Sequence, residues 1–231
     1  MKTIGLIGGM SWESTVTYYR IINEEVKKRL GGLHSAKCLL YSVDFDEIER
    51  YQKEGDWENA GHVLGEAAAS VEKAGADFII ICTNTMHKVN EDIEAKISIP
   101  VLHIADATVK QIQRTNVKTV GLLGTKYTME QDFYKSRIES AGIQVIVPDE
   151  DEREKVNNVI FDELCLGYIQ QESREYFKQV IQKLVDSGAE GIILGCTEIE
   201  LLVKPDDSIV PLFDTTSIHA KESVHMALNT N

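Results

Sequence analysis

The sequence lacks any uninterrupted apolar run near 18 residues, the length that a membrane-spanning helix requires, and it has no low-complexity tract. Its first residues enter a predicted strand directly, without the charged and apolar segments of a signal peptide. Basic residues are in the minority, because 24 Lys and Arg face 37 Asp and Glu for a net charge of −13. This charge disfavours nucleic acid and anionic membranes as partners. We therefore expect a cytoplasmic protein with neither kind of partner.

Paired cysteines are also missing. None of the four cysteines forms a Cys-x-x-Cys pair, and no histidine is spaced to complete a zinc site. We expect free thiols and no metal. Cys38 and Cys165 lie in apolar surroundings, where a free cysteine usually acts as a small buried hydrophobe. The six histidines are expected to be caps, core or surface groups, and none is predicted to be catalytic.

Strands and helices alternate along the 231 residues, a pattern typical of parallel sheets with helices on both faces. The chain also repeats itself. The segment from Gly75 to Thr85 resembles the segment from Gly188 to Glu198 at an offset of 113, and Lys2–Gly8 resembles Lys118–Gly124 at an offset of 116. Two matches at nearly one offset predict two similar halves. The predicted fold class is α/β, with two similar doubly wound domains of mainly parallel sheets: residues 1–98 with 210–231, and residues 99–209.

The repeat aligns Thr83 with Cys196, each at the exit of an apolar strand. The carboxyl edge of an open α/β sheet is where such folds bind ligands. If the two halves face each other, these residues lie on opposite walls of one cleft. Inversion at carbon requires a proton acceptor on one face of the substrate and a donor on the other. A cysteine suits this chemistry because its pKa can be lowered at a helix N-terminus.

Two other segments offer ligand contacts. The turn from Gly8 to Ser11 joins a strand to a helix without the dinucleotide fingerprint or a P-loop lysine. It is either a carboxylate-binding turn or a purely structural one. Residues 44–56 predict a charged connection that is either a lid or an ordinary solvated loop, with Gln52 as its uncharged, ligand-capable member.

Three stretches carry a resemblance to a known family: Met1–Thr15, Thr83-Asn84-Thr85-Met86-His87 and Gly195-Cys196-Thr197-Glu198. Together they resemble the aspartate/glutamate racemase family over essentially the whole chain. The runs 31–36 and 102–107 add a similarity to its bacterial members specific for L-aspartate and L-glutamate. The resemblance implies an isomerase without cofactor, a small acidic amino acid as substrate, a D-amino acid as product, and a homodimer.

The resemblance also implies roles for single residues. The family's second-domain cysteine falls on Cys196, and its first-domain Cys-Asn-Thr motif falls on Thr83-Asn84-Thr85, so Thr83 replaces a cysteine. The substrate contacts that it implies are Met10, Gln52, Asn84, Thr85, Lys155, Thr197 and Glu198. Lys155 matches a lysine that pairs with the acidic side chain of the substrate. Arg50 is out of register with an arginine of aspartate-preferring members, which leaves aspartate and glutamate both open.

The chemistry of threonine gives a further expectation. Its hydroxyl is a far weaker acid and base than a thiol, so we expect slow turnover that favours L-substrates. The alternatives are a related isomerase of the same fold, or a sensor of small dicarboxylates or amino acids whose catalysis was lost when a cysteine became threonine. Proton exchange at the α-carbon separates an enzyme from a sensor.

Overall fold

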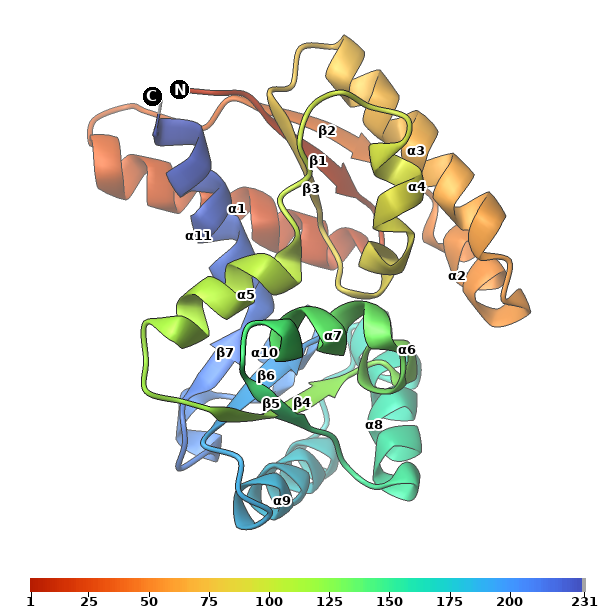
Figure 1. Ribbon diagram of the computed structural model, residues 1–231, viewed down its shortest axis with the longest axis vertical. Coiled ribbons are helices and arrows are strands. Elements are labelled where there is room, and N and C mark those ends of the chain that lie inside the picture. Colours follow the sequence, from red (N-terminus) through yellow and green to blue (C-terminus); the bar gives the residue numbers. More distant parts are fainter. Residues whose placement is uncertain (230–231) are drawn as a thin grey trace. The chain divides into compact units, whose positions relative to one another are not determined.

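The structure is a computed structural model that describes residues 1–229, and its chain forms two compact units. Unit 1 comprises residues 1–104 and the described part of 216–231, and unit 2 comprises residues 105–215. Among the described residues, no helix is both long and apolar enough to span a bilayer. Figure 1 shows the elements of each unit.

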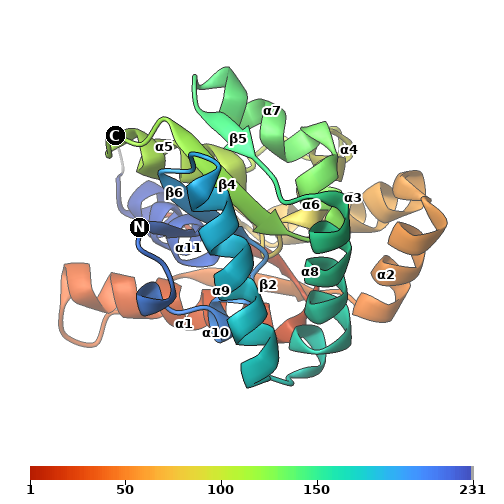
Figure 2. The ribbon, with the colours of Figure 1, turned by 90° about the horizontal axis from the view of Figure 1, so that it is seen from below.

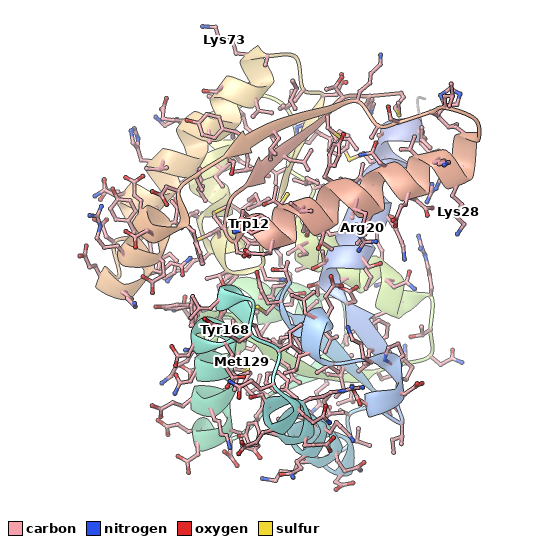
Figure 3. All side chains as sticks on the ribbon, turned by 180° about the vertical axis from the view of Figure 1, so that it is seen from behind. Trp12, Arg20, Lys28, Lys73, Met129 and Tyr168 are labelled. Atoms are coloured by element: carbon pink, nitrogen blue, oxygen red, sulfur yellow. The ribbon has the colours of Figure 1, made fainter. Side chains whose placement is uncertain are left out.

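Unit 1 contains a three-stranded parallel sheet in the order β2-β1-β3. Its elements are β1 (Ile4–Gly8), α1 (Trp12–Leu30), β2 (Cys38–Ser42), α2 (Phe45–Glu54), α3 (Trp57–Lys73), β3 (Phe78–Ile81), the 3₁₀ turn η1 (Thr85–Val89), α4 (Asn90–Glu94) and α11 (Thr215–Leu228). The strands β1 and β3 are buried throughout because helices cover both faces of the sheet. Helices α1 and α11 pack on one face and α2, α3 and α4 on the other (Figures 1 and 3).

Unit 2 contains a four-stranded parallel sheet in the order β5-β4-β6-β7. Its elements are α5 (Ile104–Gln113), β4 (Thr119–Gly124), α6 (Lys126–Glu130), α7 (Asp132–Ser140), β5 (Gln144–Ile146), α8 (Glu150–Asp162), η2 (Leu164–Leu166), α9 (Gln171–Asp186), β6 (Gly191–Gly195), α10 (Ile199–Leu202), η3 (Pro205–Asp207) and β7 (Leu212–Asp214). Helices α8 and α9 lie side by side on one face of this sheet (Figure 2). The predicted fold class, two similar α/β units with parallel sheets, is confirmed.

The repeat extends to the pairing of the central strands. In unit 1, Ile4 of β1 pairs with Phe78 of β3. The residues at the repeat offsets are Val120 and Gly191, and these two pair in the same way in unit 2. The two sheets are therefore built in one register, and the position of Thr83 after β3 corresponds to that of Cys196 after β6.

The Gly-Ala-acidic motif that opens both repeats has a structural explanation. Gly75 and Gly188 both adopt a φ of +102°, which favours glycine after a helix C-terminus. The acidic residue two positions later accepts hydrogen bonds from the backbone of the neighbouring strand. The Asp77 carboxylate accepts from Thr3 N–H at 2.5 Å, and the Glu190 carboxylate accepts from Lys118 and Thr119 N–H at 2.6 and 3.2 Å.

The boundaries of the units differ from the expected 98/99 and 209/210. Val101 forms a parallel bridge with Ile79 of β3, so residues 99–104 lie in unit 1. Leu212–Asp214 pairs with β6, so residues 210–215 lie in unit 2. In both cases a short extended segment pairs with a strand of its own unit before the chain continues into the other unit. The terminal helix α11 belongs to unit 1, where Ala220, Val224 and Ala227 join its core.

Close packing at one glycine of each central strand yields a stability prediction. A Cβ at Gly5 would lie 2.6 Å from Val71 Cγ1 and 2.7 Å from Ile79 Cδ1. At the equivalent Gly121, it would lie 2.7 Å from Ile192 Cδ1 and 3.0 Å from Leu184 Cδ1.

We expect Gly5→Ala and Gly121→Ala each to lower the free energy of unfolding by about 1–3 kcal/mol, because the added methyl group overpacks a filled core. Urea denaturation followed by circular dichroism measures the change. Lys28→Ala, on the exposed side of α1, is the control and should change it by less than about 0.5 kcal/mol. Wild-type stability in both glycine variants would contradict the prediction.

Candidate active site

In unit 1 the chain leaves β3 through Cys82 and then forms the segment Thr83-Asn84-Thr85 at the carboxyl edge of the sheet. Thr83 is half-buried, whereas Asn84 and Thr85 are buried. The Cys82 side chain packs in the apolar core with Ile4 and Leu6. Burial raises the pKa of this thiol far above its ordinary value. Cys82 therefore belongs to the core, and Thr83 is the half-buried residue that follows it at the sheet edge.

Two predicted contacts lie close to this segment. The buried Met10 of the β1–α1 turn belongs to the same core cluster as Met86, which follows Thr85 directly. The Gln52 side chain is also buried, and its Nε2 donates a hydrogen bond to Met86 Sδ at 3.0 Å. The structure thus brings Met10 and Gln52 to the turn that begins with Thr85.

The segment 44–56 is a helix rather than a charged loop. The Asp44 carboxylate caps α2 by accepting a hydrogen bond from Asp46 N–H, and Gly55 ends the helix with a φ of 72°. Ile48 and Gln52 lie four residues apart on the buried side of this helix. The many charges suggested a loop, but they occupy the solvent side of an amphipathic helix.

The glycine turn between β1 and α1 is fixed by its surroundings. Gly9 has a φ of +97°, and a Cβ there would lie 2.2 Å from the carbonyl oxygen of Val43. Its N–H donates to Thr15 Oγ1 at 2.9 Å. Ser14 Oγ donates to the Cys82 carbonyl oxygen at 3.1 Å, which ties the start of α1 to the exit of β3. The sequence analysis did not identify this link.

In unit 2 the residues after β6 form a compact polar group. Cys196, Thr197 and Glu198 are all buried. The Cys196 thiol donates to Glu198 Oε2 at a Sγ–Oε2 distance of 3.0 Å, and the Thr197 hydroxyl donates to the same oxygen at 2.7 Å. Glu198, which the resemblance placed among the substrate contacts, is thus directed at the cysteine.

The environment of Cys196 disfavours its thiolate form. Burial raises its pKa well above the ordinary value, and the charge of Glu198 and the nearby Cys165 add to the shift. We expected the helix that follows to lower this pKa, but α10 has only four residues and the negative carboxylate lies closer. The raised pKa disfavours the thiolate at neutral pH.

Lys155 lies apart from this group in the described contacts. It is exposed on α8, and its Nζ lies 3.9 Å from the centre of the Tyr176 ring, in a cation–π contact. Within unit 2 the structure therefore assembles three of the four predicted residues and leaves the lysine on the helix surface.

Histidines near Thr83 were missed as members of the site. His87 is buried, and its Nδ1–H donates to the Thr83 carbonyl oxygen at 2.9 Å. Its ring centre lies 4.4 Å from that of His103 and 5.8 Å from that of His219. The available sequence signal was the position of His87, four residues after Thr83, which is one helical turn.

Comparison with known proteins identifies the family of the chain. Residues 7–223 match the model of a protein family described as Asp/Glu/Hydantoin racemase.

The chain belongs to the Asp/Glu/hydantoin racemase family.

Similar proteins extend along the whole chain. The broad specificity amino-acid racemase RacX of Bacillus subtilis is 26% identical over 234 residues, which cover 96% of each chain. A protein of known structure from Yersinia pestis is 58% identical with a TM-score of 0.93, covering 99% of this chain and 100% of its own. PH1733 of Pyrococcus horikoshii, an aspartate racemase homologue, is 36% identical with a TM-score of 0.86. The match covers 99% of this chain and 100% of PH1733. The protein is therefore an isomerase of the amino-acid racemase type.

Buried histidines predict a loss of stability in acid. The His219 ring donates a hydrogen bond from Nε2 to the Leu102 carbonyl oxygen (2.8 Å). In its neutral form it accepts a hydrogen bond from the Tyr18 hydroxyl at Nδ1 (2.9 Å). Burial lowers its pKa from 6.5 to about 4, and burial also lowers the pKa of His87. Below pH 6.5 the unfolded chain binds a proton that the folded ring does not accept until about pH 4.

We expect the free energy of unfolding to fall as the pH decreases from 6.5 to 4, with roughly 3 kcal/mol from His219 alone. Urea denaturation at a series of pH values measures the slope. His219→Gln removes the titrating ring and should flatten it, while His225→Gln, on the exposed side of α11, should leave it unchanged. An equal slope in wild type and His219→Gln would contradict the assignment.

Proposed function

We propose that the protein racemises L-aspartate and L-glutamate without a cofactor, by proton transfer at the α-carbon with Cys196 and Thr83 on opposite faces of the substrate. The observation that carries this proposal is the hydrogen bond from the buried Cys196 thiol to Glu198, in a chain whose family consists of racemases. A sensor has no use for a thiol paired with a base. The family membership and this pair both favour the enzyme over the sensor.

The first step is activation of the cysteine. We propose that Glu198 Oε2 takes the thiol proton, leaving a thiolate beside a neutral carboxylic acid. The distance of 3.0 Å is within reach of direct transfer. A base is needed in this proposal because the raised pKa of Cys196 disfavours ionisation of the thiol at neutral pH. Glu198 is therefore assigned to the cysteine and not to the substrate.

The second step is inversion. The Cys196 thiolate removes the α-proton of the L-substrate and becomes a thiol, and the electron pair of the broken bond remains on the substrate. The Thr83 hydroxyl then gives its proton to the opposite face, and the resulting alkoxide regains one from water. The hydroxide that this leaves takes the proton held by Glu198, which returns all three groups to their starting states. Because a threonine hydroxyl is a weak acid, this delivery is the slow step in the L-to-D direction.

The remaining predicted residues hold the substrate. We propose that Asn84, Thr85 and Gln52, together with the backbone at Met10, bind the α-amino and α-carboxylate groups, and that Thr197 assists on the side of Cys196. Lys155 would leave the Tyr176 ring to pair with the acidic side chain. Such a local cation is needed because the net charge of −13 repels an anionic substrate.

The test is incubation of the purified protein in heavy water with L-aspartate or L-glutamate and no added cofactor. We expect loss of the α-proton signal by NMR and formation of the D-enantiomer by chiral chromatography. Cys196→Ser should lower both rates at least about 100-fold, because a hydroxyl is a poor base. Cys38→Ser, which changes a thiol on β2 outside the proposed mechanism, is the control and should retain both. Wild-type protein that exchanges neither amino acid would exclude the proposal.

The role of Glu198 has its own test. We expect Glu198→Gln to lower the rate of α-proton exchange by about 10²–10⁴, because an amide cannot accept the thiol proton. The residual rate should rise with pH, as hydroxide replaces the missing base. Glu200→Gln makes the same change two residues along, on α10, and should have little effect. A Glu198→Gln variant with the wild-type exchange rate would show that this carboxylate is not the base.

A further inference from the structure

Three buried histidines gather behind the Thr83 segment in unit 1. They come from separate parts of the chain: His87 from η1, His103 from the segment before α5, and His219 from α11. Among the described residues, no group of three His, Cys, Asp or Glu side chains is arranged to hold a metal ion. The rings of His87 and His219 instead form hydrogen bonds with backbone groups, so these two histidines hold segments of the chain in place.

His87 makes a specific pair of hydrogen bonds. Its Nδ1 faces the carbonyl oxygen of Thr83 at 2.9 Å, and a carbonyl can only accept. Its Nε2 faces the N–H of Ile104 at 3.2 Å, which can only donate. The ring is therefore neutral with its proton on Nδ1. The lowered pKa of His87 agrees with this single protonation state.

These two bonds join the proposed proton donor to the segment that leads out of unit 1. Ile104 is the last residue of that unit before the chain continues into unit 2. His219 binds the same segment through the Leu102 carbonyl oxygen. His87 binds the Thr83 carbonyl oxygen. Because a β-branched side chain has few χ1 rotamers, the backbone at Thr83 limits the Thr83 hydroxyl to a small number of positions.

We propose that His87 is a positioning residue for Thr83, and that its Nδ1–H bond to the Thr83 carbonyl sets the hydroxyl for proton delivery. This inference rests on the proposed function, since it assigns a partner to the weaker of the two proton-transfer groups. A misplaced hydroxyl would still allow Cys196 to remove the α-proton. Loss of the hydrogen bond between His87 and the Thr83 carbonyl should therefore slow inversion and leave α-proton exchange in place.

Two substitutions separate the two hydrogen bonds of the ring. His87→Asn places an amide N–H where Nδ1–H stood and keeps the bond to Thr83, but it cannot reach Ile104. His87→Gln places an amide oxygen where Nε2 stood and keeps the bond from Ile104 N–H, but it loses the bond to Thr83. The readout is the fraction of α-proton exchange events in heavy water that yield the D-enantiomer. Both rates come from one sample, so the fraction does not depend on how much protein is folded.

We expect His87→Gln to lower this fraction about 10-fold, and His87→Asn to keep it within about 2-fold of the wild type. His219→Asn is the matched control for damage to the cluster, because it removes a buried ring that does not contact Thr83. It should lower thermal stability and leave the fraction unchanged. A wild-type fraction in His87→Gln, or an equal fall in both His87 variants, would overturn the proposal.

Thr83→Ala distinguishes failure of this inference from failure of the proposed function. It should reduce the fraction to its lowest value by removing the hydroxyl itself. If Thr83→Ala matches the wild type, the proposed function has assigned the wrong donor. If Thr83→Ala lowers the fraction and His87→Gln does not, the donor is right and the positioning role is wrong.

Discussion

Close parallel pairing of β1 with β3, and of β4 with β6, is the constraint on which the rest of the structure depends. Ile4 pairs with Phe78, and Val120 pairs with Gly191, in the same register. In each pair a glycine leaves room for aliphatic side chains from the neighbouring strand and helix, at Gly5 and Gly121. A shift of either strand by one residue would place these side chains on the opposite face of the sheet. The register therefore fixes which residues emerge at the carboxyl edge.

The same register gives Thr83 and Cys196 equivalent positions in two different environments. The cysteine has a carboxylate partner within hydrogen-bonding distance, whereas the threonine is held through its backbone by His87. This asymmetry suits the chemistry of the two groups. A buried thiol needs a base to lose its proton, but a hydroxyl that donates a proton needs correct placement. In the proposed mechanism, one repeated scaffold thus prepares its two proton-transfer groups in two different ways.

Local charge matters more than net charge in this site. The chain carries a charge of −13, and Cys196, the cysteine of the proposed mechanism, lies beside a glutamate. Both features oppose the formation of a thiolate, and burial adds to them. The proposed transfer to Glu198 resolves this conflict, because the carboxylate is neutralised as the thiolate forms. The total charge of the pair remains at −1, and no second buried charge is created.

The sequence by itself determined the alternation of strands and helices, the two similar halves, and the equivalence of Thr83 with Cys196. These features depend on local periodicity and on short motifs that need glycine or an acidic residue at one position, as Gly75 and Asp77 illustrate. Only the tertiary structure decided that Glu198 faces the cysteine, that residues 45–54 form a helix, and that β7 pairs within unit 2. It also decided that His87 binds Thr83 and Ile104. These contacts depend on how a side chain is oriented and on which distant segments meet, and neither is encoded in the spacing of residues along the chain.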